Sequence, residues 1–363
     1  MSLAVGIVGL PNVGKSTLFR ALTRIEADAA NYPFCTIDPN VGIVPIHDGR
    51  FQALAELIQP EKCIPATLKV VDIAGLVQGA SEGEGLGNQF LSHIREVHAI
   101  AHVVRCFEDE NIAHVTGRPD PAGDAEVVET ELILTDLGQV ERKLDRLKRQ
   151  AKGDKDASTA LSVFERLRDH LGEGHAAADL RLKDEEKRLT AELQLLTEKP
   201  FFYVANVAET ELKEPGPHFI EFNDYAEKRH RTVIPVCARL EAELSEMKDE
   251  EARFFLEDLH IERSGLDQVV LRGYELLNQI TYFTADAPEL RAWEILKGTQ
   301  ADKAAGKIHT DFERGFIRAE VYHWSDLMEL GTEHAVKEAG KLRLEGRDYI
   351  VRDGDVMHFR FNV

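Results

Sequence analysis

Several residue types are scarce in this chain of 363 residues, and each scarcity narrows what the protein can be. Its four cysteines are scattered, without the C-x-x-C pairs of metal sites, so we expect reduced thiols, as in a cytoplasmic protein. No apolar run is long enough to span a bilayer. The N-terminus also lacks the basic, apolar and cleavage-site order of a signal peptide. We therefore expect a cytoplasmic protein that neither crosses a membrane nor is exported.

Positive charge is also in short supply. Lysine and arginine number 44 against 64 acidic residues, which gives a formal net charge of −20. A chain this acidic is not expected to coat itself in nucleic acid. A local basic patch remains compatible, because phosphate contacts depend on where the charges sit. The length predicts two or three domains.

The clearest motif present is the sequence GLPNVGKS at residues 9–16, which matches the phosphate loop G-x-x-x-x-G-K-[ST] at every fixed position. The apolar run at residues 3–8 predicts a strand before it, and a helix is expected to follow. The two glycines let successive N–H groups wrap a phosphate. Lys15 adds charge for the outer phosphates, and the Ser16 hydroxyl is placed to hold Mg²⁺. The motif predicts a nucleoside triphosphate site.

Further positions are expected around the phosphates. Thr36 lies in the polar loop after the first helix, where a nucleotide switch closes a threonine over Mg²⁺. Asp72 and Gly75 form D-x-x-G at the end of a buried strand. There the carboxylate can hold a water on Mg²⁺, and the Gly75 N–H can meet the γ-phosphate.

Leu76 stands where Ras-like GTPases carry the glutamine that orients the attacking water. Because leucine cannot form that hydrogen bond, either hydrolysis is slow or another group positions the water. The candidates by chain proximity are His93, His98, His102 and His114. His114 follows in a polar loop and is expected to be the freest to move. The alternative is a surface or capping histidine.

The sequence NVAE at residues 206–209 follows an expected strand, where GTPases carry N-K-x-D to read guanine. Glu209 is one methylene longer than the aspartate, and Val207 replaces the lysine. The Asn206 amide can still meet adenine, whose N1 would repel a carboxylate. Cys237 and Ala238 occupy the place of the Ser-Ala loop, whose backbone N–H faces the base. These residues predict relaxed guanine recognition and a preference for ATP.

The order of elements predicts an α/β domain at residues 1–125 and 200–280, with a mainly parallel sheet. Residues 126–199 have helical periodicity and predict an inserted antiparallel helical hairpin or coiled coil. Residues 281–363 predict a small α+β domain. A helix is expected over 266–280, with later strands at 291–295, 316–321, 348–351 and 358–361.

In combination these motifs resemble those of the Obg-like ATPases, the YchF family of translation-factor-related P-loop proteins. Residues 34–37, 83–90 and 305–312 add to the resemblance, which covers essentially the whole chain. It implies a G domain with a coiled-coil insertion and a C-terminal TGS domain of ubiquitin-like β-grasp shape. It also implies ATP rather than GTP, a hydrophobic residue in place of the catalytic glutamine, and association with ribosomes.

The motifs and the resemblance together predict roles for individual residues, with Mg²⁺ as the cofactor. The phosphate side is expected to comprise Asn12, Val13, Gly14, Lys15, Ser16 and Thr17, and the base side Phe107, Asn206, Val207, Glu209, Cys237 and Ala238. The expected metal residues are Ser16, Thr36 and Asp72, and the catalytic residues Lys15, Thr36, Gly75 and His114. Asn12 also resembles the asparagine that supports K⁺ in some potassium-dependent GTPases.

We expect a slow, Mg²⁺-dependent ATPase that acts as a monomeric nucleotide switch on the translation machinery. One alternative is a GTPase of ribosome assembly, and another is an RNA- or ribosome-binding adaptor in which hydrolysis is secondary. Arg142, Arg146 and Arg149 share one face of an expected helix. This basic face is expected to touch ribosomal RNA, and the alternative is a solvated helix surface.

Overall fold

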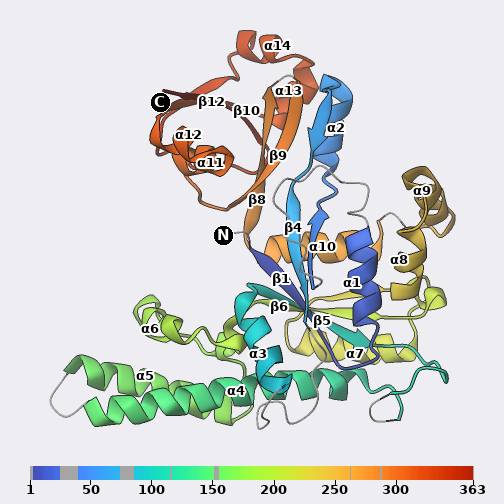
Figure 1. Cartoon of the computed structure of the whole chain (residues 1–363), viewed down its shortest axis with the longest axis vertical. Coiled ribbons are helices and arrows are strands. Elements are labelled where there is room, and N and C mark those ends of the chain that lie inside the picture. Colours follow the sequence, from blue (N-terminus) through green and yellow to red (C-terminus); the bar gives the residue numbers. More distant parts are fainter. Residues whose placement is uncertain are drawn as a thin grey trace. The chain divides into compact units, whose positions relative to one another are not determined.

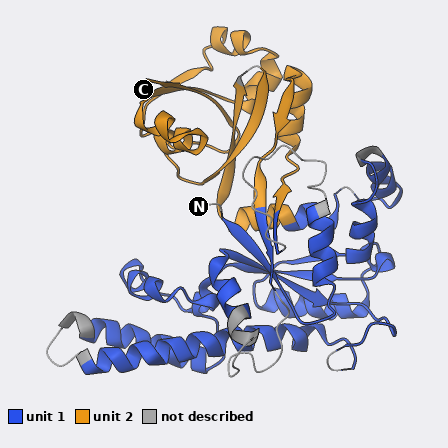
Figure 2. Cartoon of the chain, viewed as in Figure 1, with its two compact units in different colours: residues 1–42, 69–269 blue, residues 43–68, 270–363 orange. Residues whose placement is uncertain are grey.

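The computed structural model describes residues 3–24, 40–73, 86–114, 117–150, 155–261, 263–286 and 288–362. The predicted positions Thr36, Gly75 and Leu76 lie outside these ranges. The chain divides into two compact units, residues 1–42 with 69–269 and residues 43–68 with 270–363 (Figure 2). Residues 43–68 therefore group with the C-terminal strands, whereas the sequence-based boundaries assign them to the nucleotide-binding domain.

A six-stranded sheet has the order β2-β4-β1-β5-β6-β7 (Figure 1), and all of it lies in the first unit except residues 43–45 of β2 and 67–68 of β4. The strands are β1 Ala4–Val8, β2 Val41–Pro45, β4 Thr67–Asp72, β5 Ala99–Arg105, β6 Phe201–Asn206 and β7 Val233–Val236. From β4 to β7 each neighbouring pair is parallel. All residues of β1 and β5 are buried, as expected for strands covered on both faces. The mainly parallel α/β architecture is confirmed.

The helices of this unit outside the insertion alternate with its strands or follow them. They are α1 Lys15–Arg24, α3 Leu86–Glu96, α7 Pro217–Lys228, α8 Ala238–Leu244, α9 Asp249–Asp258 and the start of α10 Gly265–Leu276. Helix α10 ends before residue 280 because the next strand begins at Gln279. The predicted helix over 266–280 is thus too long at its C-terminal end.

The inserted segment contains two long helices, α4 Pro121–Gln150 and α5 Lys155–Gly172, which lie side by side (Figure 1). Their apolar stripes meet in a buried cluster that includes Leu144, Phe164 and Leu167. The last part of the insertion forms no long helix, although helical periodicity is expected over all of residues 126–199. It is divided between α6 Asp184–Thr190 and the 3₁₀ turns Ala191–Leu193 and Leu196–Glu198.

The carboxylate of Asp136 holds this last part of the insertion against α4. Asp136 is fully buried and accepts hydrogen bonds from the backbone N–H groups of Leu196 and Thr197, at 2.9 and 2.8 Å. The Thr197 hydroxyl donates a third bond at 2.7 Å. Such local satisfaction lets a charged group remain in the interior.

The second unit contains a sheet in the order β11-β10-β12-β8-β9-β3. Its strands are β3 Lys62–Ile64, β8 Gln279–Asp286, β9 Glu289–Leu296, β10 Phe316–His323, β11 Arg343–Glu345 and β12 Asp355–Phe361. Its helices are α2 Gly49–Ile58, α11 Ala301–Ile308, α12 Thr310–Arg314, α13 Trp324–Leu330 and α14 Glu333–Glu338. The strand predicted at 348–351 is wrong, because the segment contributes only an isolated bridge between Ile350 and Gln300.

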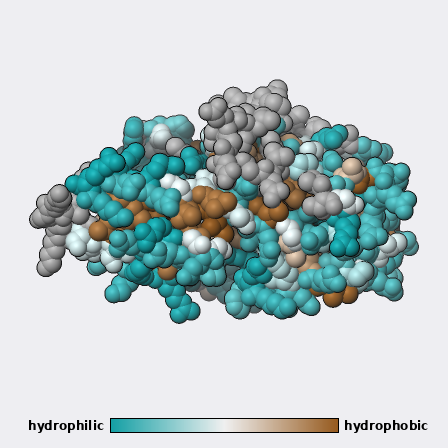
Figure 3. Space-filling view, turned by 90° about the horizontal axis from the view of Figure 1, so that it is seen from below, coloured by the Kyte–Doolittle hydropathy of each residue, from teal (hydrophilic) through white to brown (hydrophobic). Residues whose placement is uncertain are grey.

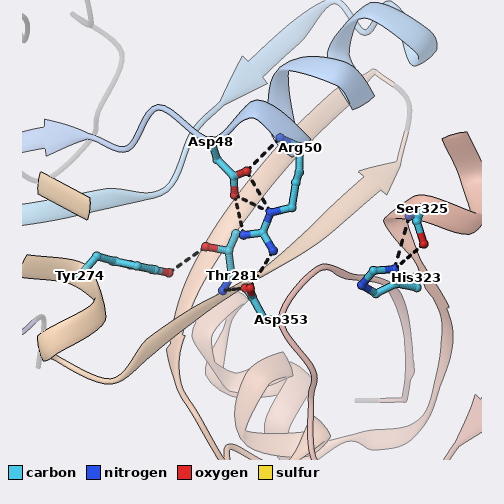
Figure 4. Close-up of polar contacts among 7 residues, drawn as sticks. All are labelled: Asp48, Arg50, Tyr274, Thr281, His323, Ser325 and Asp353. Carbon is cyan, nitrogen blue, oxygen red and sulfur yellow. Dashed lines mark hydrogen bonds and ion pairs between the residues drawn. The ribbon is translucent and has the colours of Figure 1, made fainter. Parts of the chain in front are cut away.

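Arg50, on α2, forms ion pairs that link this helix to other parts of the second unit (Figure 4). Its guanidinium contacts Asp48 and Asp353, each at 2.7 Å. Asp353 also accepts a hydrogen bond from the Thr281 N–H at 2.9 Å, and the hydroxyls of Thr281 and Tyr274 lie 2.8 Å apart. Residues far apart in the sequence therefore share one polar network.

The surface agrees with the composition. Hydrophilic residues cover most of the face drawn in Figure 3. Within the described ranges, no helix combines the length and the apolar character that a bilayer crossing needs. Cys63, Cys106 and Cys237 are free thiols, as expected.

Candidate functional site

The phosphate loop joins the end of β1 to the start of α1, as its motif predicts. Gly14 has φ +96°, and a Cβ added there would lie 2.2 Å from the Asn206 Nδ2. Both the backbone angle and the close approach therefore require glycine. Asn12 has φ 63°, in the left-handed region that asparagine tolerates better than most residues. The motif residues thus adopt conformations that most other side chains would oppose.

Lys15 and Asp72, two of the predicted site residues, lie together beside this loop. The Lys15 Nζ is 3.1 Å from the Asp72 Oδ1, and Lys15 is only 8% exposed. The contact follows from topology, because parallel β1 and β4 pair Ile7 with Asp72 and so end at the same edge of the sheet. Lys15 begins α1, and its predicted neighbour Ser16 is exposed on the first turn.

These side chains suit a magnesium ion. Hydroxyl and carboxylate oxygens are the ligands that Mg²⁺ prefers, and Ser16 and Asp72 supply one of each. P-loop nucleoside triphosphatases use this ion to bridge the outer phosphates. The donor chemistry of the described residues therefore fits Mg²⁺ bound with a nucleotide.

Asn206 connects the phosphate loop to the loop after β7. Its Nδ2 donates to the Val13 carbonyl at 2.9 Å, and its Oδ1 accepts from the Ala238 N–H at 3.0 Å. All three residues are buried. Asn206 was predicted from its possible contacts with the base, but its amide also makes these two protein contacts. It therefore sets the relative positions of two loops that the sequence assigns to the nucleotide.

The remaining base-side residues follow three adjacent strands. Phe107 lies just beyond β5 and is half-buried, and Cys237 caps the N-terminus of α8 after β7. Glu209 is exposed after β6. Burial raises the pKa of the Cys237 thiol, and the charge of Glu209 acts in the same direction.

Val207 differs from the others, because its side chain is 2% exposed and belongs to an apolar cluster. That cluster also includes Val104, Tyr203 and Phe222. The valine that stands in place of the GTPase lysine thus packs in the protein core. Any contact of Val207 with a base would have to come from its backbone.

The expectation that His114 is free to move is wrong. Its Nε2 lies 2.8 Å from the Asp124 Oδ2, and both side chains are 4% exposed. Burial raises the pKa of Asp124, while the hydrogen bond and charge of His114 oppose that shift. His114 lies in a polar loop of the sequence, and nothing in that loop indicates that Asp124, ten residues later, is its buried partner.

Among the other candidate histidines, His102 is buried on β5, and burial lowers its pKa to about 3. It therefore stays neutral near pH 7. Burial is also the main cause that lowers the pKa of His98, and Lys199 contributes. His93 is half-buried on α3. A neutral, buried imidazole such as that of His102 is a poor candidate for stabilising negative charge.

Sequence reasoning missed Arg105, the last residue of β5. It is 1% exposed, and its guanidinium donates to the carbonyls of Phe107, Asp109 and Ile112 at 3.1, 3.1 and 2.9 Å. The available signal was an arginine at the end of a strand whose other residues, apart from His102, are apolar. That position shares an edge with the phosphate loop.

The basic face lies on α4. Arg142, Arg146 and Arg149 are all exposed there, and their spacing places them on one side of the helix. Two lysines lie between them: Lys143 is paired with Glu192, and Lys148 is exposed. The helix therefore presents arginines to solvent at the predicted positions.

Comparison with known proteins extends these observations over the whole chain. Residues 4–128 match a family described as a 50S ribosome-binding GTPase, and residues 279–362 match a C-terminal YchF GTPase family described as a protein of unknown function. The chain is 54% identical over 364 residues to the Ribosome-binding ATPase YchF of Haemophilus ducreyi and 51% identical over 366 residues to that of Bacillus subtilis, each match covering 100% of both chains. The solved YchF GTPase of Schizosaccharomyces pombe superposes with a TM-score of 0.91 at 38% identity, over 99% of this chain and 98% of that one.

Proposed function

Because this chain belongs to the YchF family, we propose that it is a ribosome-binding ATPase, a nucleotide switch that hydrolyses ATP slowly. The observation that carries the nucleotide assignment is the bridge made by Asn206. It joins the Val13 carbonyl of the phosphate loop to the Ala238 N–H of the base-side loop. A single side chain thus couples the two parts of a nucleotide site.

The phosphate loop would bind ATP through its N–H groups and Lys15. The Lys15 Nζ lies 3.1 Å from the Asp72 carboxylate. When ATP binds, the Lys15 ammonium would exchange this carboxylate for the outer phosphates. Ser16, Asp72 and Thr36 would hold Mg²⁺, which neutralises phosphate charge when bound. The Oδ1 of Asn12 is the atom that would meet K⁺, since its Nδ2 donates to the Ala113 carbonyl at 3.1 Å.

Slow hydrolysis follows from the groups available to orient water. Leu76 has none to offer, and the Nε2 of His114 is engaged with Asp124 at 2.8 Å. His114 would have to leave that bond to act on a water beside Gly75 and the γ-phosphate. We therefore propose an unstimulated turnover in or below the range of about 10⁻⁴ to 10⁻² s⁻¹ known for related switches.

The preference for ATP is assigned to the base-side residues. Phe107 would pack on the base, and the Asn206 amide would meet its edge through the Nδ2 hydrogen that does not bond Val13. The Ala238 N–H donates to the Asn206 Oδ1 at 3.0 Å, so it would have to turn away from that oxygen to meet the base as well. Glu209 is exposed on a short 3₁₀ turn, one methylene longer than the aspartate that reads guanine. If GTP bound more tightly than ATP in a competition titration, the ribosome-assembly GTPase would be the better assignment.

The ribosome contact is assigned to the basic face of Arg142, Arg146 and Arg149, with the second unit as the implied TGS domain. Contacts with RNA phosphates release counterions, so binding must weaken as salt rises. We propose that the protein acts as a monomer, and that it works in the cytoplasm, where a ribosomal partner is found.

Cosedimentation with ribosomes, with and without ATP, tests this assignment. Reversing the three arginines to glutamate should weaken binding and flatten its salt dependence while leaving ATP affinity unchanged. A matched control reverses Arg188, Lys213 and Lys228, which are also exposed but lie outside α4. Equal binding of both variants at several salt concentrations would exclude this face as the docking surface. A variant that binds ATP without hydrolysing it, yet functions fully in cells, would favour the adaptor.

A further inference from the structure

The buried side chain of Arg105 holds the segment 107–114 in place. The guanidinium of Arg105 donates to three different carbonyls of this segment, those of Phe107, Asp109 and Ile112. It also lies over the Phe107 ring, 4.7 Å from the ring centroid. Arginine suits this role because its planar fork presents several donors in fixed directions.

The stability of the fold alone gives little reason to bury the Arg105 guanidinium here. Burying a guanidinium costs free energy, and an apolar side chain of similar volume is often neutral or better. Arg105 is 1% exposed, and its three hydrogen bonds all fix the backbone of one loop. The conformation of that loop is therefore what the arginine secures.

The loop in turn contacts the phosphate loop. The Ala113 carbonyl accepts a hydrogen bond from the Asn12 Nδ2 at 3.1 Å. The next residue, His114, is anchored to Asp124 near the start of α4 at 2.8 Å. The segment thus runs from the expected base-packing residue Phe107 to a direct contact with the phosphate loop.

We propose that Arg105 is a positioning residue for ATP binding, which fixes the segment 107–114 so that the Ala113 carbonyl meets Asn12 and the Phe107 ring stands at the base side. The inference rests on the proposed ATPase function and adds a residue that touches neither phosphate nor base. Arg105 acts through the loop, and its effect travels to the phosphate loop through the Asn12 contact.

The test compares Arg105→Lys with the parent protein. Lysine keeps the charge but cannot reach three separated carbonyls. ATP dissociation constants in the presence of Mg²⁺ are measured by titration at 25 °C, together with kcat, KM and the melting temperature. We expect ATP to bind about tenfold more weakly, the equivalent of roughly 1.4 kcal/mol. Arg105→Gln, which keeps only two donors on a shorter and neutral side chain, should give at least as large a loss and serves if the lysine variant does not fold.

Two comparisons separate positioning from a merely structural role. Arg343→Lys is the matched control, because Arg343 binds Glu345 and Tyr349 inside the second unit. It should lower the melting temperature while leaving ATP affinity within twofold. In an Asn12→Ala background, Arg105→Lys should cost about threefold or less, because the contact of Asn12 with the Ala113 carbonyl is already gone and only the placement of Phe107 remains to be lost.

Each outcome bears on the inference. An Arg105→Lys protein that melts earlier but binds ATP as tightly as the parent would overturn it. So would an undiminished tenfold effect in the Asn12→Ala background. A parent protein that fails to bind ATP would instead refute the proposed function, and this inference with it.

Discussion

Replacing Asn206 with alanine should disrupt both the stability of the first unit and its affinity for ATP. The substitution leaves the Val13 carbonyl and the Ala238 N–H without the partners that hold them at 2.9 and 3.0 Å. A buried polar group that loses its partner costs about 1–3 kcal/mol. The two together should lower the free energy of unfolding by about 2–6 kcal/mol.

The same loss should appear in nucleotide binding, because ATP must then restore the geometry of both loops. Each 1.4 kcal/mol corresponds to a factor of ten, so the lower bound of about 2 kcal/mol predicts roughly thirtyfold weaker binding. Titration calorimetry with ATP and urea denaturation measure the two effects on the same samples.

The matched control is Asn223→Ala. The Asn223 amide bonds only the exposed Glu227 carboxylate in the described structure, at 2.8 Å. It should change the free energy of unfolding by less than about 0.5 kcal/mol. The reasoning is refuted if Asn206→Ala matches this control in both measurements.

Three further predictions follow from single residues. Gly14→Ala should abolish ATP binding in the same titration, because its Cβ would lie 2.2 Å from the Asn206 Nδ2, and retained affinity would contradict the geometry. Glu209→Asp should shift the balance from ATP toward GTP in a competition assay, whereas an unchanged ratio would remove Glu209 from base recognition. Burial raises the pKa of Glu241 from 4.5 to about 7, so the folded state binds more protons than the unfolded state between these values and stability falls as pH rises through them. Glu241→Gln should remove this loss of about 3 kcal/mol in the free energy of unfolding. The assignment is disproved if denaturation shows the same change in unfolding free energy between pH 5 and pH 8 for the variant and the parent.

Some features were predictable because they depend on contiguous residues. The strand, glycine-containing loop and helix at the N-terminus form one short stretch, and the alternation of buried strands with helices gave the parallel sheet. The ends of elements were less certain. Helix α10 stops early because residues 279–286 pair along β9, and local helical spacing carries no information about that partner.

The sequence by itself determined which residues form the phosphate loop and which strands end beside it, since backbone conformation there follows from the residues in place. Only the tertiary structure decided what distant side chains do. Asn206 meets Val13 across 193 positions, His114 finds a buried partner in Asp124, and Lys62–Ile64 pair with β9. Such contacts depend on which elements pack together, and a side chain's partner across the fold is not encoded in its immediate neighbours.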